Sequence, residues 1–347
     1  MTTTTTDTSA RDALLPMLFG FFPPPVLHVA AVLGLPDLLV DGPRTTAELA
    51  ERTATHEPSL GRVLRALACL GVLAETAPGT YGLGPFGRGL VTDDPASLRH
   101  LVLLFASHEV WRSWSELDVT VRTGEPAWDR VTGRSAFEFM ADDPDYRAMF
   151  NRAMGEGTRN AVAGVLEVGD FGRFEHVTDV GGGDGTLLAA VLAAHPSLIG
   201  TVFDTADGMA EAAPVLAAAG VADRCTAVAG DFFAAVPAGA DAYLIKSVIH
   251  DWDDEKATAV LVRVREAMPA GATLLVVEPV MPDTPSPSRD VLMMVMSDLN
   301  MLVCTGGRER TEAEFRALLT GAGFALTRIT PATGPTNFSV LEAIARS

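Results

Sequence analysis

The order of apolar and polar positions divides the chain into two parts with different periodicity. Over residues 12–73 the apolar side chains recur at helical spacing, which predicts several short amphipathic helices. Residues 45–48 have the hydroxyl and carboxylate spacing of a capping box, and residues 59–70 are predicted as the next helix. A short hairpin around the Gly79 turn follows them. Helices followed by a hairpin predict a winged-helix-like module.

After Gly169 the pattern changes to short β-rich runs separated by helical stretches. Strands are predicted over residues 176–180, 198–204, 225–230, 242–245 and 273–277. This alternation predicts an α/β fold with a Rossmann-like, doubly wound parallel sheet that binds ligands at the carboxyl ends of its strands. With 347 residues, more than one domain is expected. We predict an α-helical, winged-helix-like domain over residues 1–105, a helical connector over 106–166, and the sheet domain over 167–347.

Charge and cysteine usage narrow the range of partners. The formal net charge of −18 disfavours nucleic acid and anionic membranes as partners. Residues 1–100 contain seven Arg and no Lys against ten Asp and Glu, so the winged-helix-like module has no basic recognition face. A DNA-binding regulator is therefore the weaker interpretation of that module. Three separated cysteines, a polar start without a signal sequence, and no uninterrupted apolar run of membrane-spanning length predict a cytoplasmic protein.

A cofactor site is predicted at the ends of three successive strands. The first strand carries Asp179 and runs into a turn that contains Gly181 and Gly183, where the backbone can approach a ligand closely. The turn lacks the G-x-G-x-x-G spacing of dinucleotide enzymes, and an amine-bearing ligand suits Asp179 better than a pyrophosphate does. Asp204 ends the second strand, where it can accept hydrogen bonds from ribose hydroxyls. At the end of the third strand, Asp231 and Phe232 suit an adenine base, so the ligand is expected to contain an adenosyl group.

The candidate base follows the fourth strand, where a substrate is expected to lie. A phenol has a pKa of about 10, and the imidazole of His250 can remove its proton during attack. Glu278 ends the fifth strand and Glu309 follows a Gly-Gly turn; either carboxylate can orient the imidazole. One His with two Glu can also bind a metal ion, but without a second His or a Cys we predict no metal here.

Several motifs together resemble a known family, the small-molecule O-methyltransferases of plant phenylpropanoid and bacterial polyketide biosynthesis, of the caffeate and carminomycin type. The resemblance covers nearly the whole chain. The motifs that carry it are residues 61–67 (GRVLRAL), 71–73 (GVL), 179–183 (DVGGG), 230–233 (GDFF), 250–252 (HDW) and 306–311 (GGRERT).

This resemblance implies a fold, a cofactor and a reaction. It implies S-adenosyl-L-methionine as cofactor, with S-adenosyl-L-homocysteine as product, and places Lys246 near the adenine. His250 matches the family's general base, and Glu278 and Glu309 match its flanking carboxylates. The N-terminal domain is then expected to form a homodimer, whose partner closes the acceptor pocket. Residues expected to bind the acceptor, by resemblance, are Phe150, Asn151, Met154, Trp252, Met294, Asp298 and Met301.

The resemblance leaves more than one chemistry open. Relatives commonly have Asp-Leu-Pro where this chain has residues 204–206 (DTA), so the start of the following helix is expected to differ. A few members of the family keep the fold and cofactor but hydroxylate, decarboxylate or carry out pericyclic reactions. The presence of His250 favours methyl transfer to a hydroxyl, and a phenolic group of an aromatic or polyketide-type secondary metabolite is the expected acceptor. Methylation of a nitrogen and metal-assisted methylation stay open beside it.

Overall fold

The computed structural model describes residues 7–334 and 336–346 and divides the chain into two compact units, Met1–His108 and Glu109–Ser347. Each unit contains its own buried hydrophobic core. The polar start predicted as a tail includes residues 1–6, which lie outside the described part of the chain.

The N-terminal unit combines helices with a small antiparallel sheet in the order β1-β3-β2. The predicted capping box is present, because the Thr45 hydroxyl accepts from the Glu48 N–H at 3.2 Å and the Glu48 carboxylate accepts from the Thr45 N–H at 2.7 Å. Helix and hairpin follow in the predicted order, which confirms the winged-helix-like module. Its elements are α1 (Asp7–Phe19), α2 (Pro23–Val32), η1 (Asp37–Leu39), β1 (Arg44–Thr45), α3 (Thr46–Thr53), α4 (Glu57–Cys69), β2 (Leu73–Ala77), β3 (Thr80–Leu83), η2 (Gly87–Leu90) and α5 (Arg99–Phe105).

An apolar stretch near the start of this unit is largely exposed. Residues Asp12–Val32 are long and apolar enough, by length and composition alone, to cross a membrane, although only 11% of the stretch is buried. The sequence predicted only short helices here and no uninterrupted apolar run of membrane-spanning length. Leu14, Met17 and Phe22 are each more than half exposed. An exposed apolar surface of this kind is typical of a segment that contacts a partner.

The second unit contains the doubly wound sheet, in the order β10-β11-β8-β7-β4-β5-β6. Strands β4 to β8 pair in parallel, whereas β10 and β11 are antiparallel at one edge and were not predicted. The strands are β4 (His176–Val180), β5 (Ile199–Asp204), β6 (Cys225–Ala229), β7 (Ala242–Lys246), β8 (Thr273–Met281), β9 (Arg310–Thr311), β10 (Phe324–Pro331) and β11 (Phe338–Ala345). The five predicted strands agree with β4 to β8 within a few residues at each end.

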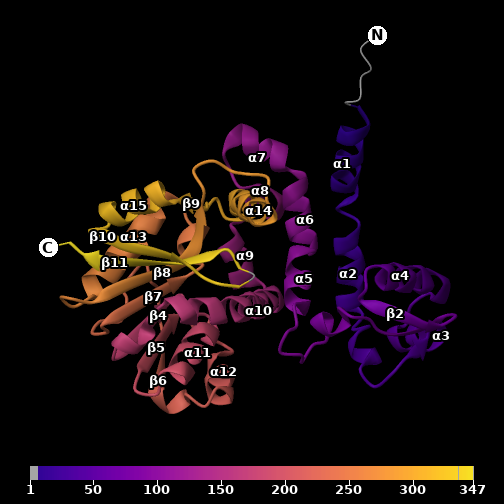
Figure 1. Ribbon diagram of the computed structural model, residues 1–347, viewed down its shortest axis with the longest axis horizontal. Coiled ribbons are helices and arrows are strands. Elements are labelled where there is room, and N and C mark those ends of the chain that lie inside the picture. The colour runs from indigo at the N-terminus through magenta and orange to yellow at the C-terminus, as the bar shows by residue number, and fades with distance from the viewer. Residues whose placement is uncertain (1–6, 335, 347) are drawn as a thin grey trace, which may run out of the picture. The chain divides into compact units, whose positions relative to one another are not determined.

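Helices cover both faces of this sheet (Figure 1). Side chains alternate along each strand, so Tyr243 belongs to the core cluster on one face and Leu244 to the cluster on the other. The helical segments are α6 (His108–Ser115), α7 (Leu117–Thr123), α8 (Ala127–Thr132), α9 (Ala136–Asp142), α10 (Pro144–Val168), η3 (Phe171–Arg173), α11 (Thr186–Ala194), α12 (Ala212–Ala218), η4 (Ala222–Arg224), η5 (Ile249–Asp251), α13 (Asp254–Ala267), α14 (Arg289–Cys304) and α15 (Glu312–Gly321). Residues 109–166 of the predicted connector therefore belong to the same compact unit as the sheet, and among their helices α10 contacts β11.

Candidate active site

The carboxyl ends of β4, β5 and β6 bring the predicted cofactor-binding turns together. The N–H of Gly181 donates to the Phe203 carbonyl at 2.8 Å, and the N–H of Gly230 donates to the Asp204 carbonyl at 2.9 Å. The strand order reverses between β4 and β7, so this edge contains the switch point where ligands bind in open α/β sheets.

The glycine turn has a backbone conformation that suits glycine. Gly181 has a φ of 72°, and a Cβ there would lie 2.5 Å from the Val248 side chain. Gly183 has a φ of 55°, and a Cβ there would meet nothing within 4 Å, which leaves room beside the turn. The Asp204 carboxylate accepts from the Gly183 N–H at 2.9 Å and from the Thr205 N–H at 2.6 Å. Asp204, at the end of β5, therefore fixes the glycine turn that follows β4.

The three acidic residues at these strand ends differ in burial. Asp179 is 2% exposed, and burial raises its pKa to about 7 against the opposing effect of Lys246. Burial also raises the pKa of Asp204, while its hydrogen bonds from Gly183 and Thr205 oppose that change. Asp231 is exposed and accepts from the Phe233 N–H at 2.8 Å. Asp204 and Asp231 are thus better placed than Asp179 to contact a ligand.

Lys246 lies on the other side of the switch point from Asp231 and Phe232. In the sheet, β7 is the neighbour of β4 on one side, and β5 and β6 lie on its other side. Its ammonium donates to the Ser247 hydroxyl at 3.0 Å and lies 4.7 Å from the centre of the Phe338 ring. Burial lowers its pKa. These contacts connect Lys246 to β11, whereas the assignment to the adenine remains a prediction.

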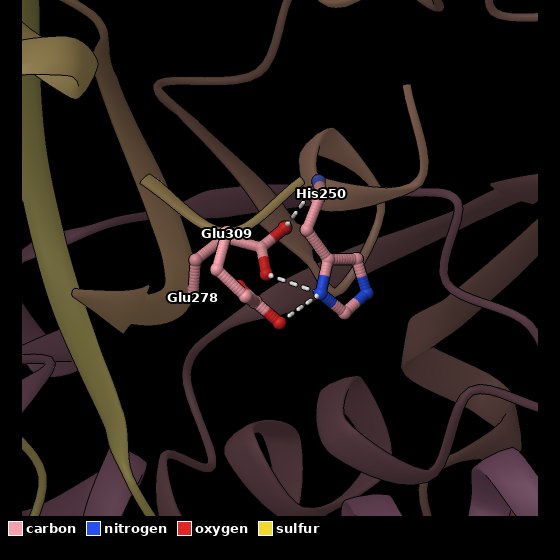
Figure 2. Close-up of side chains that lie close together, drawn as sticks. All are labelled: His250, Glu278 and Glu309. Carbon is pink, nitrogen blue, oxygen red and sulfur yellow. Dashed lines mark hydrogen bonds and ion pairs between the residues drawn. The ribbon is translucent and has the colours of Figure 1, made fainter. Parts of the chain in front are cut away.

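His250 lies in η5, and two buried carboxylates from distant segments both approach the Nδ1 side of its ring (Figure 2). Its Nδ1 is 3.0 Å from Glu309 Oε1 and 3.5 Å from Glu278 Oε2. Carboxylates only accept hydrogen bonds, so Nδ1 carries the proton and Nε2 is the nitrogen that can accept another. Asp251 Oδ1 is 3.9 Å from that Nε2.

The two glutamates have different tasks, a question that the sequence left open. Glu278 Oε1 accepts from the backbone N–H groups of Val248, Ile249 and His250, at 3.0, 3.0 and 3.4 Å. Glu309 Oε1 instead accepts from the imidazole and from the Ser297 hydroxyl, the latter at 2.7 Å. Glu278 therefore fixes the backbone of the turn, and Glu309 orients the ring.

Burial and charge act in opposite directions on His250. Burial alone would lower its pKa, but Glu278, Glu309 and Asp251 together outweigh burial and raise the pKa to about 10. Burial raises the pKa of Glu278, and the imidazole opposes that change. The cluster thus binds a proton strongly. With this pKa the imidazole is mostly protonated at neutral pH, so His250 can accept a proton only in its neutral fraction.

The same three side chains also meet the geometric requirement for a metal site. One ligand atom each from His250, Glu278 and Glu309 lie within 4.8 Å of one another. Glu278 Oε1 and Glu309 Oε1 are already used by N–H and O–H donors. Metal-free operation remains the prediction.

Helix α14 positions part of the site, and two of its contributions were not predicted. Ser297 holds Glu309 as described above, and Asp298 Oδ1 accepts from the Glu309 N–H at 2.9 Å. Asn300 accepts from the indole N–H of Trp114 at 3.0 Å. The family resemblance assigns Asp298 to the acceptor instead. The position of Ser297 on the methionine-rich helix was the only sequence signal that could have pointed to it.

Apart from Trp252, the remaining residues predicted to bind the acceptor lie on α10 and α14. Phe150 and Met154 are half-buried on α10, where the Asn151 amide donates to the Asp207 carbonyl at 2.9 Å, on the loop after β5. Met294 lines a cavity of about 370 Å³ with Phe338 and other residues. Met301 lies one turn after Ser297, and its sulfur is 3.9 Å from the Thr305 hydroxyl. Asn151 thus connects α10 to the cofactor loop.

Trp252 belongs to an aromatic cluster beside Phe232. Its ring stacks on that of Phe137, with 4.7 Å between the ring centres. It meets the rings of Phe233 and Phe232 edge to face, with 5.0 and 6.5 Å between the ring centres. Its buried indole Nε1 has no hydrogen-bond partner among the described residues. These ring contacts connect Trp252 to the proposed adenine end of the site, and its role toward the acceptor stays a prediction.

A glycine turn with acidic strand ends at the switch point of an α/β sheet is typical of a nucleoside-binding enzyme, and a carboxylate-paired histidine lies next to it. The sequence identifies the family more narrowly. Residues 114–325 match an O-methyltransferase domain, and residues 15–93 match an O-methyltransferase dimerisation domain.

Known proteins with similar sequence and structure agree with this match. The chain is 43% identical over 336 residues to the O-demethylpuromycin-O-methyltransferase of Streptomyces alboniger, which covers 96% of this chain and 89% of that protein. The crystal structure of LaPhzM superimposes with a TM-score of 0.92 at 38% identity, covering 97% of this chain and 99% of that one. A third similar protein is NcsB1, an O-methyltransferase of neocarzinostatin biosynthesis crystallised with S-adenosylmethionine and 2-hydroxy-5-methyl naphthoic acid. Its structure superimposes with a TM-score of 0.77 at 35% identity, covering 93% of this chain and 95% of that one.

The chain therefore belongs to the O-methyltransferase family and is an S-adenosylmethionine-dependent O-methyltransferase. The residues at the sheet edge fit this cofactor. There is open space beside Gly183, carboxylates end β5 and β6, and an aromatic ring follows the second of them.

Proposed function

We propose that this enzyme methylates a phenolic hydroxyl of an aromatic or polyketide-type secondary metabolite, with His250 as general base. The observation that carries the proposal is the pairing of His250 Nδ1 with Glu309 at 3.0 Å, which leaves Nε2 to accept a proton. When bound, S-adenosylmethionine supplies an electrophilic methyl group. Relatives that act on O-demethylpuromycin, or that bind a hydroxynaphthoic acid, support an aromatic acceptor.

The chain contributes orientation and proton transfer. Gly183, Asp204 and Asp231 hold the cofactor at the strand ends, while Glu278 and Glu309 hold the imidazole at the edge next to them. His250 removes the hydroxyl proton at Nε2, and the resulting imidazolium is stabilised by the two carboxylates. Much of the rate then comes from aligning the two substrates.

The experiment that tests this function is methyl transfer from cofactor labelled in its methyl group. The acceptors are O-demethylpuromycin, a hydroxyphenazine, a hydroxynaphthoic acid and the corresponding amino compounds. Labelled methyl ether with stoichiometric S-adenosylhomocysteine supports the proposal. Product formed without S-adenosylhomocysteine would indicate that the fold serves hydroxylation, decarboxylation or a pericyclic reaction. Loss of activity after exhaustive chelation would favour metal-assisted methylation.

A homodimer formed through the N-terminal unit is part of the proposal. The matched dimerisation domain and the exposed apolar side chains of α1 and α2 support it, since burying such a surface stabilises an association. The partner's N-terminal segment would then close the acceptor pocket. The acidic net charge and the separated cysteines support a cytoplasmic enzyme that binds neither nucleic acid nor membranes.

A further inference from the structure

Arg310 is a buried cation outside the set of residues predicted for the site. It is 0% exposed and is the largest fully buried side chain among the described residues. It lies in β9, one residue after Glu309. Burying a guanidinium away from water costs free energy unless all of its N–H donors are paired. The groups that accept these hydrogen bonds therefore indicate the role of the buried arginine.

Every N–H group of this guanidinium has an acceptor. Nε and Nη2 donate to Asp254 Oδ1 at 2.9 and 2.8 Å, which also neutralises the charge. Nη1 donates to the Ile249 carbonyl at 3.0 Å and, at a longer 3.5 Å, to the Arg308 carbonyl. Nη2 also donates to the Trp252 carbonyl at 2.9 Å. These bonds use the five donors of an arginine.

The Ile249 and Trp252 carbonyls lie on either side of His250 and Asp251. The carbonyl of His250 itself accepts from the Arg308 N–H at 2.8 Å, and a Cβ at Gly307 would overlap that carbonyl oxygen. On the opposite side, Glu278 accepts the N–H of His250 and those of the two residues before it. The segment that contains Arg310 therefore holds the carbonyl side of the turn while Glu278 holds its amide side.

We infer that Arg310 is a positioning residue, which fixes the backbone of the turn from Ile249 to Trp252 so that the imidazole of His250 meets the acceptor hydroxyl. This role rests on the proposed function of His250. Lysine cannot replace it, because an ammonium lacks the planar fork that reaches both carbonyls and Asp254 at once. Arg310 thus affects the chemical step and not the binding of the cofactor.

Arg224 provides a matched control in the same unit. Its guanidinium also donates to three carbonyls, those of Leu192, His195 and Leu198, at 2.8, 3.3 and 2.7 Å. These residues are at the end of α11 and the start of β5, away from the carboxyl edge. Arg224→Ala and Arg224→Lys therefore measure how much folding stability is lost when such an arginine is replaced away from the site.

The test compares Arg310→Ala and Arg310→Lys with these controls in the full-length dimer, with the hydroxynaphthoic acid or whichever acceptor of the panel is turned over. For Arg310→Ala we expect kcat to fall about 100-fold, as for a misplacement of about 1 Å, with the Kd for S-adenosylmethionine within twofold of wild type. Added guanidinium ion should restore kcat at least about tenfold by occupying the space left. The Arg224 variants should lose Tm but not kcat, and guanidinium should not help them. If Arg310→Ala does not fold, Arg310→Lys carries the same comparison with a fall of about tenfold.

A spectroscopic readout makes the test independent of turnover. The ring resonances of His250, assigned by their absence in His250→Gln, should shift in Arg310→Lys and stay unchanged in Arg224→Lys. Unchanged resonances and a kcat loss no larger than that of the Arg224 control would overturn the inference. Wild-type turnover in His250→Gln would instead overturn the proposed base, so the two failures are distinguishable.

Discussion

Replacing Glu309 by glutamine removes a charge from the site with little change in shape. The amide oxygen of Glu309→Gln can still accept from the Ser297 hydroxyl and from Nδ1 of His250, as Oε1 does at 2.7 and 3.0 Å. Its NH2 group takes the place of Oε2, which is buried and has no hydrogen-bond partner among the described residues. The imidazole therefore keeps its tautomer and loses one of the three carboxylates that stabilise its cation.

The size and sign of the effect follow from this geometry. An anion within about 4–6 Å raises the pKa of a base by about 1–3 units, so its removal lowers the pKa of His250 by at least about one unit. Since His250 must be neutral to act as a base, kcat/KM falls as the pH drops through its pKa. In wild type this acidic limb of the pH profile lies near pH 10, because the carboxylates raise the pKa of His250 from the ordinary value of about 6.5 to about 10. In Glu309→Gln the limb moves to lower pH.

The plateau above the limb also changes. One pKa unit corresponds to about 1.4 kcal/mol of imidazolium stabilisation, so a shift of one unit lowers the plateau by up to about tenfold. The assay is kcat/KM for the acceptor between about pH 6 and 11.5 at saturating cofactor, because this ratio reports the pKa of the enzyme before the acceptor binds. Glu312→Gln serves as control, since Glu312 is an exposed carboxylate that pairs with Arg316. A limb that stays in place, or that moves to higher pH, would refute the assignment of Glu309.

Three further outcomes are expected. Asp204→Ala should weaken S-adenosylmethionine binding about 10- to 100-fold in calorimetry, because hydrogen bonds to a charged group contribute about 1.5–3 kcal/mol; unchanged affinity would contradict the ribose assignment. Gly307→Ala should lower kcat by about 100-fold with an unaltered cofactor Kd, since the new Cβ overlaps the His250 carbonyl and displaces the turn; wild-type kcat would show that the turn tolerates displacement. Phe22→Glu should convert the dimer to monomer in analytical ultracentrifugation, because it places a charge on the exposed apolar surface of the N-terminal unit, and a persistent dimer would place the interface elsewhere.

The sequence predicted the parts of the fold that depend on local pattern. Strands β4, β5, β7 and β8 are largely buried and therefore appear as short apolar runs, and the capping box at Thr45 depends on a spacing of three residues. Strands β10 and β11 were missed. Their residues alternate between buried and exposed less regularly, and the strands pair with each other around a register shift near Arg328. Such strands give a weaker signal than buried parallel ones.

The candidate site shows the same limit. Asp204 and His250 could be predicted because strand ends and motifs mark them within a few residues. Ser297 and Arg310 could not, since their roles depend on contacts with Glu309 and with Asp254, 12 and 56 residues away in the chain. Local spacing contains no information about which distant carbonyls a side chain meets once the chain is folded.

The most direct test of the central claim is single-turnover methyl transfer by His250→Gln, with cofactor binding measured on the same sample. Glutamine can occupy the space of the imidazole but cannot take up the hydroxyl proton. We predict an unchanged Kd for S-adenosylmethionine and a methyl-transfer rate lowered by about 100- to 10,000-fold, the usual contribution of a general base. A rate equal to that of wild type on the same acceptor would contradict the account.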